Sequence, residues 1–274
     1  MGELDRLAPA RDLEVDRRFA AARLLVTVGG TPQGQVTVPL RAGRATAAEL
    51  SLAVAALPAA GTVAVAPSAA DPVTVVVATR NRPESLARCL RAVLASDHPA
   101  LSVVVVDNDP DDERTELAVR AAGSDRVRYV REPRRGASVG RNRGLAEART
   151  EIVAFTDDDT EVDPAWASRI AGAFAADPEL ACVSGPVLAA RLGSPEERAA
   201  DVALAWNKGF TPRRFTLAEP PRTPRSSPSP PACSASAPTS PCGPGPPAPS
   251  AASTRPWARA PPPTVARTAS SWSA

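Results

Sequence analysis

Residues 73–83 read Val-Thr-Val-Val-Val-Ala-Thr-Arg-Asn-Arg-Pro, an apolar run followed by polar side chains and a proline. A short run rich in β-branched residues is typical of a buried parallel strand, and proline suits the first turn of a helix. The apolar side chains that follow share one helical face, at Leu86, Leu90, Val93 and Leu94. The stretch therefore predicts a strand over 73–77 that leads into a helix.

The same alternation continues towards the C-terminus. Short, mostly apolar runs follow at 101–106, 127–130 and 152–155. After them, Trp166, Ile170 and Phe174 repeat every four residues, as in a helix that faces a core. Core packing explains all these apolar positions. The pattern predicts an α/β fold, with a mostly parallel sheet flanked by helices.

Residues 1–66 are predicted to form a small α+β appendage that carries no chemistry. Runs at 24–28 and 35–40 are separated by a glycine-rich segment and indicate a hairpin. A helical pattern follows at Leu50, Val54 and Leu57. The proline-bounded stretch 67–72 is interpreted as a linker to the α/β domain, which we place at 73–216.

Residues 217–274 form a low-complexity tail. From Pro220 onwards there are 16 of the chain's 31 prolines and no Leu, Ile, Met, Phe, Asp, Glu or Lys. Such a composition buries too little apolar surface to offset the entropy of ordering. We expect this proline-rich tail to be disordered.

Composition narrows the classes of partner and compartment. The net charge of +2, with acids and bases interspersed, argues against nucleic acid as the main partner. The four cysteines lack the spacing of a disulfide framework or a zinc site. No signal-like segment and no apolar run of about 18 residues is present, so no transmembrane segment is expected. The predicted setting is cytoplasmic, with peripheral contact at the inner face of the membrane left open.

Polar side chains follow three of the predicted strands. They are Thr79, Asn81 and Arg82 after the first, Asp107, Asn108 and Asp109 after the second, and Asp157, Asp158 and Asp159 after the fourth. Each group alone is more often a turn or a helix cap. In open α/β sheets, however, ligands bind beyond the carboxyl ends of the strands. Three groups at one sheet edge therefore favour a binding site.

The aspartate triplet points to a metal-bound ligand. Adjacent carboxylates repel one another unless water or a cation neutralises them. Mg²⁺ and Mn²⁺ suit carboxylate oxygens, and Mg²⁺ often completes its shell with water and substrate phosphates. A metal-bound diphosphate is the favoured interpretation, with a solvated acidic turn as the alternative.

The segment 136–145 combines glycines, a predicted helix start and two arginines. Both helix N-termini and arginine favour phosphate oxygens. Three more arginines precede the segment, at 131, 134 and 135, and a solvated loop remains the alternative to an anion site. The only histidine, His98, is predicted to lie in a surface turn, because no nucleophile or metal-ligand partner is spaced around it.

Four motifs in order resemble glycosyltransferase family 2, whose members are inverting enzymes of GT-A fold. They are Val-Val-Ala-Thr-Arg-Asn-Arg-Pro at 76–83, Val-Val-Asp-Asn at 105–108, Gly-Arg-Asn-Arg-Gly-Leu at 140–145 and Phe-Thr-Asp-Asp-Asp at 155–159. The resemblance covers roughly residues 73–210. It implies transfer of a sugar from a nucleoside diphosphate to an acceptor hydroxyl with inversion. It leaves the acceptor unknown, whether a glycan, a lipid or another hydroxyl compound.

The resemblance also implies residue roles. Thr79 and Arg82 would border the nucleotide, Asp107 would bind its base, and Asp157 would lie near the ribose. Asp159, with Asp157, would ligate Mn²⁺ or Mg²⁺ through the Asp-x-Asp pattern. The full donor-binding set is Thr79, Asn81, Arg82, Asp107, Asn108, Arg141, Asn142, Asp157 and Asp158.

The tail lacks the general base that an inverting transferase requires. In the resembled family this base is a carboxylate of the acceptor half, and the chain has no carboxylate side chain after Glu219. A shifted reading frame would explain this: GC-rich codons that are permissible for residues 253–259 can be chosen so that, read one base earlier, they give Phe-Asp-Pro-Ala-Leu-Gly-Ala, which resembles an acceptor-half motif. We expect donor binding with little or no transfer. The alternatives are a non-catalytic nucleotide-binding or proline-rich interaction protein and a nucleotidyltransferase.

Overall fold

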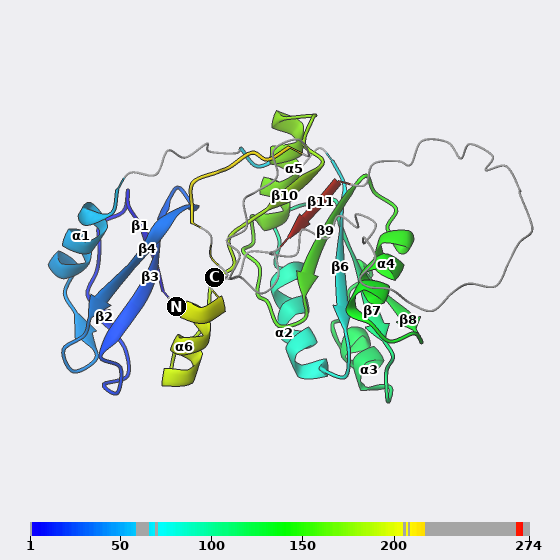
Figure 1. Cartoon of the computed structure of the whole chain (residues 1–274), viewed down its shortest axis with the longest axis horizontal. Helices are drawn as coiled ribbons and strands as arrows, with labels where there is room; N and C mark the ends of the chain where they lie inside the picture. Colours follow the sequence, from blue (N-terminus) through cyan, green and yellow to red (C-terminus); the bar gives the residue numbers. More distant parts are fainter. Residues whose placement is uncertain are drawn as a thin grey trace, which may run out of the picture.

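The computed structural model describes residues 2–58, 66–68, 71–204, 207 and 209–216, together with the backbone of 267–270. These residues form a small N-terminal unit and a larger α/β unit (Figure 1). Within these ranges no helix is long and apolar enough to cross a membrane.

The α/β unit is built on a six-stranded sheet of order β10-β11-β9-β6-β7-β8, in which every neighbouring pair is parallel. Its strands are β6 (Val73–Thr79), β7 (Leu101–Asn108), β8 (Val127–Glu132), β9 (Ile152–Asp157), β10 (Cys182–Ser184) and β11 (Arg267–Ser270). The four predicted strands are thus present, each extended at its carboxyl end. Because those extensions carry the polar residues, the strand ends themselves present the candidate site.

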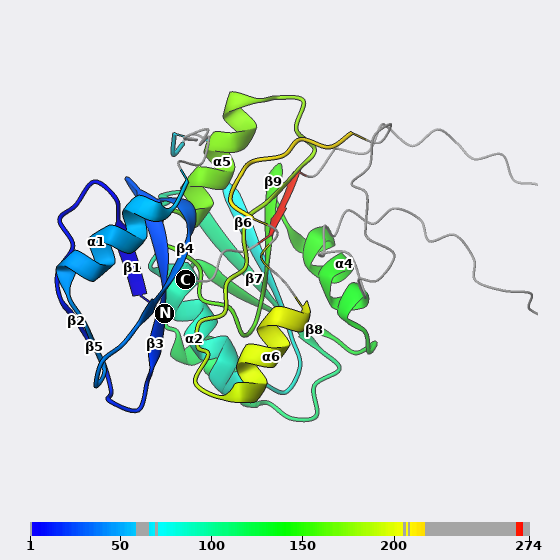
Figure 2. The same cartoon turned by 60° about the vertical axis from the view of Figure 1, so that its left-hand side comes forward.

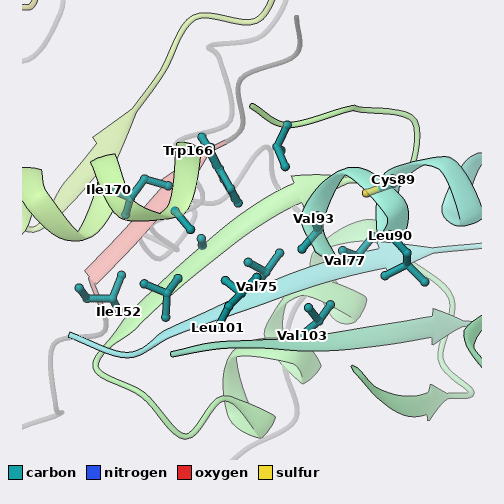
Figure 3. Close-up of a cluster of buried hydrophobic side chains, with 14 of the residues drawn as sticks. Val75, Val77, Cys89, Leu90, Val93, Leu101, Val103, Ile152, Trp166 and Ile170 are labelled. Atoms are coloured by element: carbon teal, nitrogen blue, oxygen red, sulfur yellow. The ribbon is translucent and has the colours of Figure 1, made fainter. Parts of the chain in front are cut away.

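Helices cover both faces of the sheet. On one face, α2 (Pro83–Leu94), α3 (Arg114–Ala121) and α5 (Trp166–Ala176) pack onto alternate valines of β6 and β7. Figure 3 shows this core, where Leu90 and Val93 of α2 and Trp166 of α5 lie against the strands. On the other face lies α4 (Ala137–Glu147), which contributes Leu145 to a second apolar cluster. The predicted α/β architecture is confirmed.

Two glycines let α4 approach the sheet closely. A Cβ on Gly144 would lie 2.2 Å from Cγ1 of the buried Val76, well inside contact distance. A Cβ on Gly140 would lie 3.3 Å from the Cβ of Ala78. The glycines of the 140–145 motif thus bring the first turns of α4 against the carboxyl ends of β6 and β7.

The N-terminal unit has a core of its own. Strands β1 (Gly2–Asp5), β3 (Ala21–Val28) and β4 (Thr31–Pro39) form one sheet, and β2 (Leu13–Glu14) pairs with β5 (Arg44–Ala45). Helix α1 (Ala47–Ala56) closes it through the buried Leu50. The predicted hairpin is present but tighter, because Gly29 and Gly30 adopt φ of 55° and 72° and turn the chain in two residues.

Side-chain contacts join the N-terminal unit to the α/β unit. Figure 2 shows the chain turned so that the N-terminal unit comes forward. Arg169 of α5 donates from Nη1 to Oγ1 of Thr31 at 2.9 Å. Arg23 of β3 pairs with Asp201 of α6 (Pro195–Leu204) at 2.5 Å. The predicted linker begins against α5, where the N–H of Ser68 donates to the carbonyl of Ser168. The appendage is therefore docked on the α/β unit.

The backbone of β11 departs from the expectation that nothing after residue 217 is packed. It lies between β9 and β10, with Arg267 beside Ile152 and Thr268 beside Cys182. An open edge of β9 presents unpaired N–H and C=O groups, and any extended segment can pair with them. The predicted disorder of the rest of the tail concerns 217–266 and 271–274, which lie outside the described residues.

The prediction that His98 lies at the surface is wrong. Its side chain is 1% exposed, although it does follow a turn after α2. The turn is covered because Asp97 donates its N–H to the carbonyl of Pro164 and accepts a hydrogen bond from the hydroxyl of Ser168. Neither ring nitrogen makes a hydrogen bond of normal geometry among the described residues, and burial lowers the pKa of His98, an effect that the nearby Asp97 and the backbone of Asp71 oppose. The ring serves as a neutral packing residue before β7, at the opposite end of the strand from the candidate site.

Candidate functional site

Strand register brings the three polar groups together at one sheet edge. Thr79, the last residue of β6, lies beside Asp107 of β7, and Ala78 lies beside Asp157 of β9. Strand β6 lies between β9 and β7, so the aspartate triplet and the polar group of β7 are only one strand apart. The predicted convergence of these residues is present.

Asp158 points into the protein rather than outwards. Thr79 donates its hydroxyl to Oδ2 of Asp158 at 2.6 Å, and Arg82 donates Nη1 to Oδ1 at 3.3 Å. Burial raises the pKa of Asp158, and the hydrogen bond from Thr79 opposes that rise. This carboxylate therefore ties the end of β9 to the end of β6 and to the start of α2.

Asp157 and Asp159 flank it and are largely exposed. Arg141 of α4 donates Nη2 to Oδ1 of Asp157 at 2.7 Å. Arg82 also reaches Oδ2 of Asp159, at 3.3 Å from the same Nη1 that contacts Asp158. The repulsion expected within the triplet is thus relieved by two arginines on helices that cover opposite faces of the sheet.

Asp107 is completely buried at the end of β7. Tyr129 of β8 donates its hydroxyl to Oδ2 at 2.9 Å, whereas Oδ1 makes no hydrogen bond of normal geometry in the described part of the chain, although the buried hydroxyl of Thr115 in α3 is near enough to lower the pKa of Asp107. Burial raises the pKa of Asp107, and the hydrogen bond from Tyr129 opposes it. A buried carboxylate oxygen without a partner is costly in a finished protein. This oxygen is therefore suited to receive a donor from a ligand.

Asn108 is engaged within the protein. Its Nδ2 donates to the carbonyl of Arg134 at 2.5 Å, and its Oδ1 accepts from the N–H of Gly136 at 2.9 Å. These bonds hold the loop that starts α4 against the end of β7. Arg134 is further held by the buried Glu132. Asn108 thus positions the helix that carries Arg141.

The two remaining predicted residues are Asn81, which joins two loops, and Asn142, which is exposed. Asn81, at φ 55°, exchanges hydrogen bonds with Asp111 and so joins the loop after β6 to the loop after β7. Arg80 pairs with Asp109 across the same junction, at 3.0 Å. Asn142 is exposed on α4, and its side chain forms no hydrogen bond within the described ranges.

The arginine cluster is largely paired. Arg134 contacts Glu132, Arg141 contacts Asp157, and Arg143 contacts Glu147. Arg131 and Arg135 are exposed. Among the described arginines of this cluster, Arg141 is thus the one whose guanidinium pairs with a carboxylate of the candidate site.

Sequence reasoning missed two residues that touch the site. Tyr129 donates a hydrogen bond to Asp107, but its position in a mostly apolar strand gave no indication of a polar role. Cys89 of α2 contacts the carbonyl of Asp157 through Sγ at 3.4 Å, and burial, reinforced by the nearby aspartates, raises its pKa to about 12. A cysteine on an apolar helix face gives no sequence signal of such a contact.

The triplet fits a metal held partly by its ligand. Among the residues that the structure describes, no three His, Cys, Asp or Glu side chains are grouped so as to hold a metal alone. Asp157 and Asp159 nevertheless present accessible carboxylates beside the inward Asp158. Mg²⁺ and related cations often use one or two carboxylates together with substrate phosphates and waters. These residues suit that arrangement and not an all-protein cage.

Comparison with known proteins finds a family match that covers most of the α/β unit. The model of the family described as glycosyl transferase family 2 matches residues 74–221, more than half of the chain. An uncharacterized glycosyltransferase of Escherichia coli, YibD, is 30% identical over 92 residues, covering 33% of this chain and 27% of that protein. A Campylobacter jejuni GalNAc(5)-diNAcBac-PP-undecaprenol β-1,3-glucosyltransferase is 30% identical over 92 residues, covering 32% of this chain and 30% of that protein.

A solved structure is similar as well. The mannosyltransferase PcManGT of Pyrobaculum calidifontis, in complex with GDP-Man and Mn²⁺, is 23% identical, with a TM-score of 0.41. The match covers 54% of this chain and 57% of that one. The chain spans about a third or less of the length of the two curated relatives from Escherichia coli and Campylobacter jejuni.

Proposed function

This chain belongs to glycosyl transferase family 2, and we propose that it binds a nucleoside diphosphate sugar together with Mn²⁺ or Mg²⁺ at the carboxyl ends of β6, β7 and β9. The observation that carries the proposal is the convergence of Thr79, Asp107 and the aspartate triplet on one sheet edge. The family match over 74–221 contains all of these residues.

The buried Asp107 supports placing the nucleotide base beside β7. Its Oδ1 makes no hydrogen bond of normal geometry among the described residues, so an N–H of the base would satisfy it. Thr79 and Asp158 stiffen the neighbouring strand ends, and Asn108 holds the start of α4 in place. In this arrangement Arg82 and Arg141 offer guanidinium groups to the diphosphate.

The reaction that we propose is transfer of the sugar with inversion. The acceptor oxygen forms a bond to the anomeric carbon, the bond from that carbon to the diphosphate breaks, and the acceptor's proton passes to a general base. A metal held by Asp157 and Asp159 would stabilise the departing diphosphate. The chain after Glu219 has no carboxylate side chain for the base, so we propose little or no transfer by this chain.

The proposal is tested by titrating the protein with UDP and GDP, with and without Mn²⁺, in a calorimeter. We expect Mn²⁺ to strengthen nucleotide binding by about tenfold or more, as is usual for coupled sites. Asp159→Ala should abolish this gain, whereas Asp125→Ala, at an exposed aspartate before β8, should retain it. Metal-independent binding, or an unchanged gain in Asp159→Ala, would contradict the proposed site.

The origin of the tail is tested separately by sequencing the gene across codons 210–274. We propose that the frame one base earlier encodes the acceptor-half motifs that this chain lacks. A verified DNA sequence without such motifs in that frame would leave the proline-rich tail as an authentic segment.

A further inference from the structure

Arg82 occupies Asp159, one of the two carboxylates that the proposed metal would need. Its Nη1 lies 3.3 Å from Oδ1 of Asp158 and 3.3 Å from Oδ2 of Asp159, so one nitrogen bridges two side chains. Arginine remains charged at every ordinary pH, so this cation is always present at the triplet. The aspartates therefore already have a counter-ion of the protein's own.

The two partners of Arg82 differ in their freedom to move. Asp158 is held by Thr79 at 2.6 Å, and its side chain is 8% exposed. Asp159 is 57% exposed, and Arg82 itself is 59% exposed. Asp159 and the guanidinium can therefore separate by side-chain rotation in solvent, while Asp158 stays in place.

Two cations cannot share Asp159 without cost. A divalent ion on this carboxylate would lie close to the guanidinium and repel it. A diphosphate removes the conflict, because its oxygens accept hydrogen bonds from the guanidinium in place of Asp159.

We propose that Arg82 is a positioning residue that makes metal binding at this site depend on the diphosphate. In the free protein it holds Asp159, and when a diphosphate is present it turns to the phosphate oxygens and releases Asp159 to the metal. The inference rests on the proposed function and explains why metal and nucleotide would bind cooperatively. Because coupling between two ligands is reciprocal, Arg82 would also make the nucleotide bind better with metal.

The test measures Mn²⁺ binding to the full chain by electron paramagnetic resonance, with and without UDP or GDP. In the unmodified protein we expect Mn²⁺ alone to bind weakly and either nucleotide to tighten it by about tenfold or more. In Arg82→Gln, Mn²⁺ alone should bind about fivefold more tightly, and the gain from nucleotide should shrink. A residue that only supported the fold would weaken metal binding when replaced.

Two further variants act as controls. Arg91→Gln, an exposed arginine on the same helix α2, makes the same change in net charge and should leave Mn²⁺ binding unchanged. Arg82→Met removes the charge while keeping a long side chain; it should bind Mn²⁺ alone as tightly as Arg82→Gln, and it serves if Arg82→Gln folds poorly.

The outcomes separate the two proposals. Mn²⁺ that binds no tighter to Arg82→Gln than to the unmodified protein, with the gain from nucleotide kept in both, overturns the role of Arg82 alone. Mn²⁺ that binds the unmodified protein equally well with and without nucleotide means, by reciprocity, metal-independent nucleotide binding, and so overturns the proposed function as well. Failure of Mn²⁺ to bind the folded protein even with UDP or GDP overturns the proposed function and this inference with it.

Discussion

Glu132 is a buried carboxylate that supports the site through Arg134, which it binds at the main-chain N–H, Nε and Nη2. These hydrogen bonds lower its pKa from 4.5 to about 2. Because the unfolded chain keeps the higher value, the interaction stabilises the fold above about pH 4.5, and this contribution is lost as the pH falls towards about 2. We expect Glu132→Gln to lower the free energy of unfolding near neutral pH and to flatten its decline in acid. Urea denaturation at neutral pH and at pH values down to about 2 measures both the loss of stability and its pH dependence.

The control for this residue is Glu113→Gln, which removes an exposed carboxylate at the start of α3. It should leave the pH dependence of stability unchanged. If the unfolding free energy of Glu132→Gln declines in acid as steeply as that of the unmodified protein, Glu132 does not cause the pH dependence.

At the scale of elements, the packing of α4 on β6 depends on Gly144, where a Cβ would lie 2.2 Å from Val76. Overpacking of a core costs about 1–3 kcal/mol, against about 1 kcal/mol gained by alanine in a helix. We expect Gly144→Ala to destabilise the protein by up to about 2 kcal/mol, the balance of these two effects, in urea denaturation. Gly140→Ala is the matched control on the same helix, since its Cβ would meet neighbours at 3.3 and 3.4 Å. Equal stability of the two variants would contradict the argument.

At the scale of the whole molecule, two arginines hold the N-terminal unit on the α/β unit: Arg169 at Thr31 and Arg23 at Asp201. Each partly exposed contact contributes up to about 1 kcal/mol, so neither alone is expected to fix the docking. We expect Arg23→Ala combined with Arg169→Ala to loosen it, with faster amide hydrogen exchange in the turn at 29–31. Exchange in the buried strand β6 should not change.

Arg44→Ala is the control for the docking, because it breaks an exposed pair with Glu14 inside the N-terminal unit. It should leave exchange in the 29–31 turn as it is. If the double variant also leaves that turn unchanged, contacts other than these two arginines hold the unit.

Local pattern alone was sufficient to predict the α/β layout. The runs that form β6, β7 and β9 are buried strands because a continuous apolar run has to be covered on both faces, whereas β8 is a half-buried edge strand. Pro83 begins α2, and Gly136 precedes α4, since both effects depend only on neighbouring backbone. The meeting of Thr79, Asp107 and Asp157 at one edge followed from the geometry of parallel strands.

Tertiary structure decided the contacts between side chains distant in the chain. It placed Asp158 inward on Thr79 and left Asp159 on Arg82, a difference that three identical adjacent residues cannot reveal. It also buried His98 beneath the residues that start α5, about 65 positions later in the chain. Burial and ion pairing depend on what packs against a residue from elsewhere in the chain. The sequence by itself therefore determined which residues reach the sheet edge, and only packing decided which of the aspartates remained accessible there.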